Sequence, residues 1–386
     1  MKKTDFITPE TYRNQFTRPR LHGPNGWMLF AATNQGLSLA DHVKREYDKH
    51  LKANGSKLKG IPLLNNPTQG GPDDRKIIQR FEDTETCPFL PSHTAGSNLY
   101  IFDYTHDVRG ETSVNDNLFQ LYAMVRTARV AGAKTITVVV PYLAYSRQDK
   151  PTAFKREATN AKLVADFFVT AGAHGIITYH PHSNGIRGFY EPNMRFIALD
   201  GLDLFIEIYG DRFKGAKDLS VVSTDAGGAK LTVHLAEALD IPYAISAKYR
   251  HEVDKAKVEV LGIVGDFQGK TRAIVADDES VTFTSVYNAV KQLYQEHNVA
   301  EIFVLLSHCK IRKQHIPKLI EAHEKLGVTE FHFTDSVPQS DDLLKLSSFV
   351  TRHSLAERFA RTINRHHYNQ SVSELFYRPN GDGNHS

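Results

Sequence analysis

The chain has 386 residues, of which 41% are hydrophobic and 24% are charged, and its formal net charge at pH 7 is +3. This length is long for one hydrophobic core and comfortable for two domains, and so small a net charge predicts no nucleic-acid partner. No apolar run approaches the ~20 residues of a membrane span, and Cys87 and Cys309 fit neither a metal site nor a disulfide framework, so we expect a cytoplasmic protein without a membrane partner.

From residue 98 onward, short apolar runs alternate with longer segments of helical periodicity. Such strand–helix alternation predicts an α/β fold with parallel sheets that are covered on both faces by helices. The pattern occurs once before about residue 195 and once after it, which predicts two similar domains. The expected strands are 99–103, 135–140, 175–179, 219–224, 273–277, 302–307 and 330–335, and the expected helices are 115–131, 157–172, 227–239, 284–297, 313–326 and 347–366.

Three segments fall outside that alternation. Residues 1–27 contain arginine, proline and asparagine without periodicity, and we expect an extended N-terminal arm there. Residues 53–75 are rich in glycine, asparagine, proline and lysine, which predicts a loop. Residues 377–386 carry no periodicity either, and a frayed C-terminal tail is expected.

The strand expected at 135–140 ends at Pro141, which has no N–H for a strand ladder. The polar side chains that follow it directly are Tyr142, Tyr145, Arg147, Gln148 and Asp149. Polar groups at the carboxyl end of a strand in an open α/β sheet lie where ligands bind. Two aromatic rings, a cation, an amide and a carboxylate suit the base, the phosphates and the metal or hydroxyl groups of a nucleotide. This loop therefore predicts a nucleotide site.

The run Pro141-Tyr-x-x-Tyr-x-Arg-Gln-Asp149, followed by Ala161-Lys-Leu-Val-Ala165, resembles the ATP-site signature of the ribose-phosphate pyrophosphokinase (PRPP synthetase) family. Members of that family move the β,γ-diphosphate of ATP to the C1 hydroxyl of ribose 5-phosphate and release AMP. The resemblance runs from about Met28 to Phe376. It implies two tandem type I phosphoribosyltransferase-like domains: an ATP-binding domain over 28–195 that is completed by 347–376, and a ribose-binding domain over 196–346.

The same resemblance implies that the protein is a homo-oligomer, either a dimer or a hexamer. The segment Arg80-Phe-Glu-Asp-Thr-Glu85 resembles a family turn that reaches the adenine of ATP bound to a neighbouring subunit. An aromatic ring can stack on a base, and carboxylates can accept hydrogen bonds from its exocyclic amine. Phe81, Asp83 and Glu85 are therefore expected to bind ATP across a subunit interface.

Two further motifs imply a Mg²⁺ site. In Tyr179-His-Pro-His-Ser-Asn-Gly-Ile-Arg-Gly-Phe-Tyr190, His182 matches the family's histidine ligand of the Mg²⁺ that ATP carries, while His180 replaces a family aspartate. The segment Ser223-Thr-Asp-Ala-Gly-Gly228 resembles the family's Ser-Pro-Asp-x-Gly-Gly. It makes Asp225 a candidate for the ribose and the metal, with Gly227 and Gly228 admitting the substrate.

The chemical step needs cations, because attack on the β-phosphorus builds negative charge on the phosphate oxygens and on the leaving AMP. Ala247-Lys-Tyr-Arg250 resembles the family's Lys-Arg-Arg catalytic loop, and Gly262-Ile-Val-Gly-Asp266 follows it as in the family. Lys248 and Arg250 are the expected catalytic residues, since they match the first and third cations of that loop.

The acceptor loop departs from the family pattern. Asp277 and Asp278 match the two aspartates expected at the ribose hydroxyls, and Thr282, Thr284 and Ser285 offer hydroxyl groups near the 5-phosphate. Val281 replaces an aspartate, Phe283 a small residue and Thr284 a glycine, which should spoil a tight cradle for a terminal monophosphate. We therefore expect ADP-ribose as the preferred acceptor, as in phage-encoded relatives that make ADP-ribose pyrophosphate, which would place the enzyme in NAD metabolism within a host cytoplasm.

Two alternatives to the ADP-ribose hypothesis stay open. An ordinary family enzyme would use ribose 5-phosphate and serve nucleotide biosynthesis. A non-catalytic regulatory homologue would retain the fold without turnover. A cationic stretch after His308 bears on this choice, since Lys310, Arg312 and Lys313 could meet the second phosphate of ADP-ribose.

Overall fold

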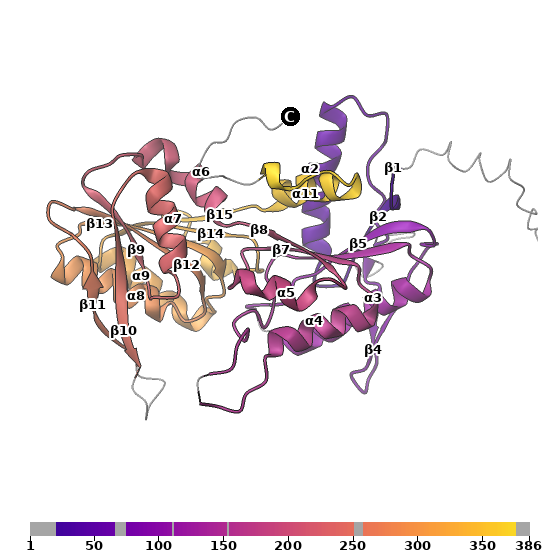
Figure 1. Cartoon of the computed structure of the whole chain (residues 1–386), viewed down its shortest axis with the longest axis horizontal. Helices are drawn as coiled ribbons and strands as arrows, with labels where there is room; N and C mark the ends of the chain where they lie inside the picture. The colour runs from indigo at the N-terminus through magenta and orange to yellow at the C-terminus, as the bar shows by residue number, and fades with distance from the viewer. Residues whose placement is uncertain (1–20, 66–74, 110–111, 153, 251–257, 376–386) are drawn as a thin grey trace, which may run out of the picture.

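The computed structural model describes residues 21–65, 75–109, 112–152, 154–250 and 258–375, with the backbone alone at 247–250, 258–261 and 374. Two open sheets lie side by side, with helices on the faces of both (Figure 1). The predicted α/β fold with mostly parallel sheets is confirmed. No helix of the described residues is long and apolar enough to cross a membrane. The segments 1–20 of the expected arm and 377–386 of the expected tail lie outside the described residues.

The first sheet is parallel except at its β1 edge. Its strands, in spatial order, are β1 (His22–Gly23), β2 (Gly26–Ala32), β5 (Ser97–Phe102), β6 (Thr135–Val140), β7 (Gly175–Tyr179) and β8 (Arg195–Leu199). The β-branched residues of β6 and β7 are buried because helices cover both faces, as is usual for parallel sheets. Since β8 pairs with β7, the first sheet runs past the boundary predicted at residue 195.

Two pairs of helices enclose the first sheet. On one face lie α3 (Val114–Val130) and α4 (Asn160–Ala171), whose apolar residues share a core with β5 and β6. On the other face lie α2 (Leu37–Ala53) and α11 (Ala356–His367). Short elements complete this half of the molecule: the hairpin of β3 (Ile78–Arg80) and β4 (Thr86–Pro88), then η2 (Asn184–Ile186) and α5 (Arg187–Tyr190).

The second sheet is parallel except where β10 pairs with β11. Its strands, in spatial order, are β11 (Val258–Val264), β10 (Tyr243–Arg250), β9 (Leu219–Ser223), β12 (Arg272–Ser280), β13 (Glu301–Cys309), β14 (Val328–Thr334) and β15 (Val350–His353). One face packs on α6 (Leu202–Phe213) and α7 (Ala229–Leu239), and the other on α8 (Thr284–Glu296) and α9 (Ile316–Lys325). Short helices η3 (Lys313–His315), α10 (Asp341–Leu344) and η4 (Ser373–Leu375) lie in the connections.

The last part of the chain returns from the second sheet to the first. The single helix predicted over 347–366 is wrong, because β15 first extends the second sheet and only then does α11 begin. Figure 1 shows α11 lying against α2. Leu355, Phe359 and Ile363 are fully buried there in one core with β2, and Asn364 donates a hydrogen bond to the Tyr47 hydroxyl at 2.8 Å. The first sheet is thus covered by residues from both ends of the chain.

Candidate functional site

The carboxyl ends of the two sheets face each other and share a cleft. A cavity of about 480 Å³ lies there, lined by residues of both halves of the chain. From the first half come the loop after β6, the loop after β7 and the end of β8, and from the second half come the loop after β9 and the end of β12. Ligands bind at such strand ends in open α/β sheets, so this cavity is the candidate site.

Two neighbouring aspartates end β12 at this cleft. Asp277 is 8% exposed, and its carboxylate accepts hydrogen bonds from the Thr224 hydroxyl and, at 2.9 Å, from the Asp278 amide. Burial and the nearby Asp278 charge raise the pKa of Asp277 well above its ordinary value. Burial acts on Asp278 in the same direction, but hydrogen bonds with His182 and Asp277 hold the pKa of Asp278 below its ordinary value. The two neighbouring carboxyl groups are therefore shifted in opposite directions, with the pKa of Asp277 raised and that of Asp278 lowered.

The two histidines after β7 have different environments. His182 Nδ1 lies 2.6 Å from Asp278 Oδ2 across the cleft, and this hydrogen bond raises the pKa of His182. His180 instead hydrogen-bonds the Ser307 hydroxyl, and burial lowers the pKa of His180, which keeps its ring neutral. His308 Nε2 donates to the His180 carbonyl at 3.0 Å. His182 is thus presented to the cavity beside a carboxylate, while His180 joins the two halves of the protein.

The loop after β6 brings only part of its predicted nucleotide-binding set to the cleft. Asp149 lines the cavity, and Arg147 Nε lies 2.8 Å from Oε1 of Glu279, the residue after the cavity-lining Asp278. Gln148 Oε1 accepts a hydrogen bond from Asn160 Nδ2 at 2.5 Å. Tyr145 faces away, with its hydroxyl donating to Asn115 Oδ1 at 2.6 Å. The structure therefore brings Arg147 and Asp149 to the site and turns Tyr145 toward α3.

The glycine loop after β9 is held by its own aspartate. Asp225 Oδ1 accepts from the amides of Gly227 and Gly228 at 2.9 and 3.1 Å, and Ser223 Oγ donates to the Asp225 carbonyl at 2.8 Å. Both glycines line the cavity. Gly228 lies directly beside the aspartate pair, since a Cβ added to it would be 3.8 Å from Asp277 Oδ1. Asp225 Oδ1 therefore fixes the conformation of the glycine loop that lines the cavity.

The N-terminus of α8 corrects our expectation for Phe283. Its ring is fully buried and packs on Phe331 with ring centroids 5.9 Å apart, so it does not fill the phosphate cradle. The residue adopts a left-handed conformation (φ 59°) directly before the helix, a backbone that glycine usually provides. Thr284 begins the helix, and its hydroxyl accepts from Lys318 Nζ at 2.9 Å. Thr282 and Ser285 flank these two residues. The turn at the helix start is retained although its residues differ.

The predicted catalytic cations lie on β10. Lys248 pairs with Val260 and Arg250 with Val258 in the antiparallel ladder, and the register shifts between Ala247 and Lys248. The side chains of Lys248 and Arg250 lie outside the described residues, so their role stays a prediction.

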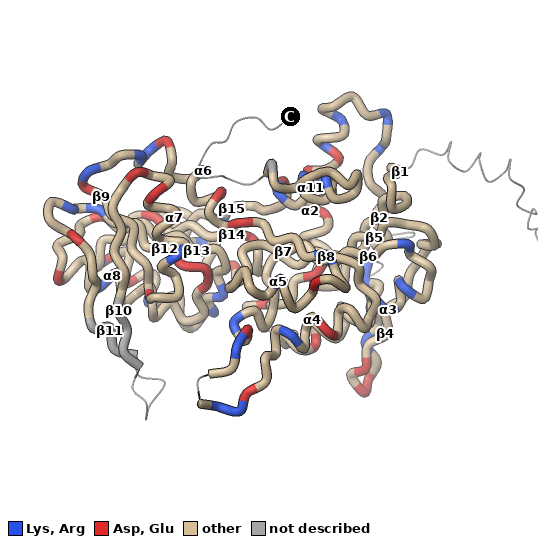
Figure 2. The backbone as a smooth tube through the Cα atoms, in the orientation of Figure 1, with Lys and Arg blue, Asp and Glu red and all other residues tan. Residues whose placement is uncertain are grey.

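The predicted adenine-binding residues lie away from the cleft. Phe81, Asp83 and Glu85 form the turn of the β3–β4 hairpin, and the Phe81 side chain is 46% exposed. Asp83 Oδ1 accepts from the Glu85 amide at 3.1 Å, which fixes the turn. In Figure 2 the acidic tip of this hairpin projects from the lower edge near β4. None of the three residues lines the cavity of this chain.

The residues at the cleft fit a magnesium ion only together with a substrate. Among the described residues, no group of three or more histidine, cysteine, aspartate or glutamate side chains could hold a metal ion. Ionised Asp278 with adjacent His182 offers a partial site, and Mg²⁺ is commonly bound by one or two carboxylates plus substrate phosphates. The donor set therefore suits a nucleotide-bound Mg²⁺ better than a resident one.

One cluster of side chains beside the cleft was not predicted from the sequence. Lys310 is 3% exposed, and its ammonium group contacts Tyr142 and Glu279. The expectation that Lys310 could meet a substrate phosphate is therefore wrong. No motif marked Glu279, because its partner Lys310 directly follows a neighbouring strand and lies 31 residues away in the sequence.

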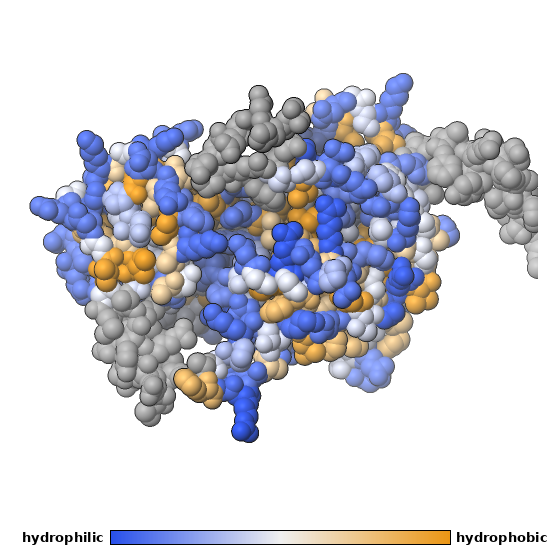
Figure 3. Space-filling view, viewed as in Figure 1, coloured by the Kyte–Doolittle hydropathy of each residue, from blue (hydrophilic) through white to orange (hydrophobic). Residues whose placement is uncertain are grey.

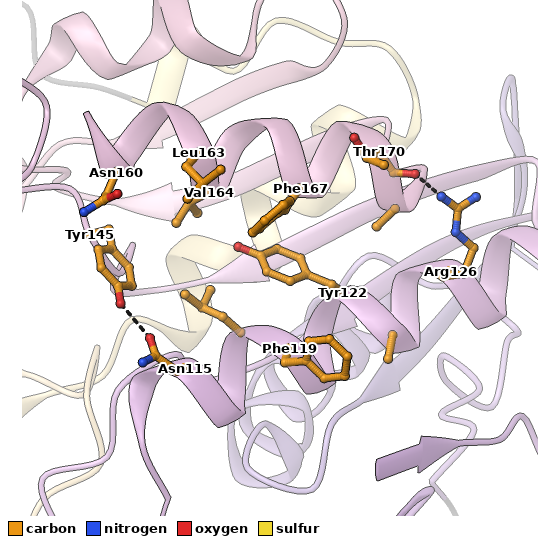
Figure 4. A pocket seen from close by; sticks show the side chains of 13 residues that line it. Asn115, Phe119, Tyr122, Arg126, Tyr145, Asn160, Leu163, Val164, Phe167 and Thr170 are labelled. Carbon is orange, nitrogen blue, oxygen red and sulfur yellow. Dashed lines mark hydrogen bonds between the residues drawn. The ribbon is translucent and has the colours of Figure 1, made fainter. Parts of the chain in front are cut away.

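A second cavity of about 600 Å³ is an apolar groove between α3 and α4 (Figure 4). Phe119, Leu163 and Phe167 lie along it and are 65%, 47% and 48% exposed. Apolar residues also gather along the lower edge of the surface in Figure 3. Among the described residues that line the groove, Arg126 alone carries a charge, and it donates to the Thr170 carbonyl. The groove thus lacks the charged groups of a phosphate site.

Comparisons with known proteins agree with the fold. Residues 69–172 match the family model of the N-terminal domain of ribose phosphate pyrophosphokinase. The ribose-phosphate pyrophosphokinase of Fusobacterium nucleatum is 33% identical over 305 residues, which are 78% of this chain and 89% of that protein. That of Bacillus subtilis is 32% identical, covering 78% and 88%. The crystal structure of phosphoribosylpyrophosphate synthetase from Mycobacterium smegmatis superposes with a TM-score of 0.71 at 24% identity, covering 89% of this chain and 99% of that one.

Proposed function

The chain belongs to the ribose-phosphate pyrophosphokinase family, and we propose that it transfers the β,γ-diphosphate of ATP to the C1 hydroxyl of ribose 5-phosphate. The choice of ribose 5-phosphate as acceptor is supported by the turn before α8. There the buried Phe283 takes the left-handed conformation and leaves the helix start open. Helix N-termini bind phosphate through their free N–H groups. The 5-phosphate would therefore lie at Thr282, Thr284 and Ser285.

The proposed reaction divides its substrates between the two sheets. ATP lies against Arg147, Gln148 and Asp149 of the first sheet, and the ribose hydroxyls lie against Asp277 and Asp278 of the second. The contact between His182 of the first half and Asp278 of the second supports this division, because it spans the cleft between the proposed half-sites. Mg²⁺, carried by ATP, would be held by His182 and Asp278 with the phosphates, and Asp225 is the further ligand that the family motif proposes. The metal supplies charge neutralisation for the phosphate groups.

The transfer forms one bond and breaks one. The C1 oxygen of the ribose attacks the β-phosphorus, the bond from that phosphorus to the α,β-bridging oxygen breaks, and AMP leaves with the electron pair. The hydroxyl proton passes to water. Lys248 and Arg250 would neutralise charge on the phosphate oxygens and on AMP, since positioning and electrostatics dominate phosphoryl transfer.

ADP-ribose is the second candidate acceptor. Thr284 stands at the start of α8 with its hydroxyl bound by Lys318, and Val281 lacks the carboxylate that the family pattern has there. A site altered at these positions favours an acceptor whose 5-phosphate continues into a second phosphate. Burial of Phe283 and Lys310 weakens this hypothesis, because neither side chain is available to reshape the site or bind that phosphate.

We expect purified protein with ATP and Mg²⁺ to release AMP with ribose 5-phosphate faster than with ADP-ribose. The measurement is AMP formation with each acceptor, with mass analysis of the product. Faster AMP release with ADP-ribose would favour the second candidate and overturn our assignment of the α8 turn. No AMP with either acceptor would instead favour a regulatory homologue, provided that the protein is folded and binds ATP.

We further propose that the enzyme is a homo-oligomer with ATP sites completed between subunits. The adenine-binding candidates Phe81, Asp83 and Glu85 lie on an exposed hairpin away from the cleft of their own chain. The apolar groove between α3 and α4 offers area for a subunit contact, because exposed apolar patches of this kind mark interaction sites.

Mixed oligomers test this proposal. Phe81→Ala and Lys248→Ala are each expected to be inactive alone, since each removes one part of every site. Mixing them should restore up to about a quarter of wild-type activity per interface, because one shared site in four receives both intact residues when random mixing pairs the chains. Activity that never exceeds that of the separate variants, despite subunit exchange shown by native mass spectrometry, would contradict a shared site.

A further inference from the structure

Four side chains form an ionic cluster where the two sheets meet: Tyr142, Arg147, Glu279 and Lys310. Tyr142 and Arg147 belong to the loop after β6, while Glu279 ends β12 and Lys310 follows β13. The tube in Figure 2 shows charged stretches of both signs beside β12 and β13. The cluster therefore joins the nucleotide-binding loop to the strand that carries the acceptor-binding aspartates.

Lys310 is the buried centre of this ionic cluster. Its Nζ donates to Tyr142 Oη at 2.8 Å and to Glu279 Oε2 at 2.5 Å, and it lies 4.3 Å from the centroid of the Tyr142 ring. The side chains of Lys310 and Glu279 are only 4% and 5% exposed. Burial lowers the pKa of Lys310, and the Glu279 charge opposes that shift. A lysine and a glutamate at this depth need each other, since an unpaired buried charge is strongly destabilising.

Arg147 shares the same glutamate but is bound differently. Its Nε lies 2.8 Å from Glu279 Oε1, and its side chain is 55% exposed. Glu279 Oε1 accepts no hydrogen bond, so the contact is an ion pair without the directed geometry that strengthens such pairs. Arg147 is therefore attached to Glu279 by charge, and more than half of its side chain stays exposed to a ligand.

The charges of the cluster do not cancel. Glu279 carries one negative charge, while Lys310 and Arg147 each carry a positive one, so the cluster keeps one net positive charge. Lys310 is held inside and satisfies Glu279 through a hydrogen bond. The remaining positive charge resides on the exposed Arg147.

We infer that Lys310 is a positioning residue for ATP: by neutralising Glu279 from inside the protein, it leaves the Arg147 guanidinium free to bind phosphate. Without Lys310, Glu279 would be a buried carboxylate whose remaining ion pair is the one with Arg147. Arg147 would then be held by Glu279 and would offer no net charge to a nucleotide. This inference rests on the proposed role of Arg147 in ATP binding.

The inference predicts effects of opposite sign for the two members of the buried pair. Lys310→Met should weaken ATP binding about tenfold, equal to ~1.4 kcal/mol, because one unit of positive charge is lost near the phosphates. Glu279→Gln should strengthen ATP binding, because Arg147 loses its internal competitor. The double variant Glu279→Gln/Lys310→Met should bind ATP close to wild type, since both charges are gone and Arg147 remains. A merely structural pair would weaken binding in all three variants.

The experiment is calorimetric titration of the full-length variants with Mg²⁺ and a non-transferable ATP analogue, paired with thermal melting. Lys325→Met is the matched control, because Lys325 lies exposed on α9 and pairs with Glu321 one turn earlier, away from the cluster. Its affinity for the analogue should equal that of wild type. The KM for ribose 5-phosphate should change little in the folded variants, because the acceptor aspartates are untouched.

Wild-type affinity in folded Lys310→Met, or weaker binding in Glu279→Gln, would overturn the inference. If Lys310→Met does not fold, Glu279→Gln and the double variant still decide the question by the sign of their change in affinity. Analogue binding by wild type without AMP release from ribose 5-phosphate would contradict the proposed reaction while leaving this inference supported by the binding data. Failure of wild type to bind the analogue would overturn both.

Discussion

Lys248→Ala is expected to lower the turnover of AMP release by about 10²–10³-fold, the usual effect of removing one group that stabilises transition-state charge. The affinity for ATP should stay near that of wild type, because Lys248 lies on β10 of the second sheet and ATP is assigned to the loop after β6. The measurement pairs steady-state AMP release with calorimetric titration of an ATP analogue. Turnover would thus fall while binding remains.

Lys291→Ala is the control for this substitution, since Lys291 is an exposed lysine on α8 of the same sheet. Its turnover should equal that of wild type. Lys248→Arg keeps a cation on the strand and should retain more activity than the alanine variant. Wild-type turnover in folded Lys248→Ala would remove the electrostatic role assigned to this residue. Loss of ATP binding together with turnover would assign Lys248 to substrate binding.

Phe283→Ala is expected to lower the free energy of unfolding by about 3–5 kcal/mol, the range for truncating a buried phenylalanine. The ring is fully buried against Phe331 in the core of the second sheet. Phe283→Gly should be no less stable than Phe283→Ala, although glycine is smaller and more flexible. The residue has φ 59°, and glycine relieves a left-handed strain of ~1–2 kcal/mol for other residues. Chemical denaturation of the three proteins measures both differences.

The chain contains a matched control for the Phe283 series. Phe154 also has a left-handed backbone, with φ 63°, but its side chain is fully exposed. Phe154→Ala should change the free energy of unfolding by less than about 0.5 kcal/mol, as surface substitutions generally do. A small loss of stability in Phe283→Ala would mean that the ring is not a core residue. The Phe283 side chain could then occupy the phosphate cradle, as we expected from the sequence.

The architecture was largely predictable because burial leaves a strong pattern in parallel sheets. Strands such as β6 and β7 are continuous apolar runs, and the helices between them are long enough to show their period. Residues before 98 were harder: β2 and α2 were not predicted, and α2 is polar on much of its surface. The helix predicted over 347–366 failed because β15 is short and is placed by pairing with β14, which local periodicity does not encode.

The site was predictable where a motif fixes both chemistry and position. Arg147, Asp149, His182 and the Asp277–Asp278 pair follow strand ends, and the structure brings them to one cleft. The direction of a side chain was not predictable. Phe283 points into the core from a left-handed backbone, and Lys310 turns inward toward Glu279 of the neighbouring β12. Such choices depend on contacts between segments that are distant in the sequence.

The return of α11 to the first sheet has a consequence for synthesis on the ribosome. All the strands described for that sheet have been made when β8 is complete, yet α11 begins only at Ala356, after the whole second sheet. At ~5–20 residues per second, the interval lasts roughly 8–30 s. During that time the nascent chain exposes the apolar face of β2 and α2 on which Leu355, Phe359 and Ile363 later pack. The half of the protein that is translated first is therefore the last to close, and a chaperone that recognises apolar segments has its binding site in that interval.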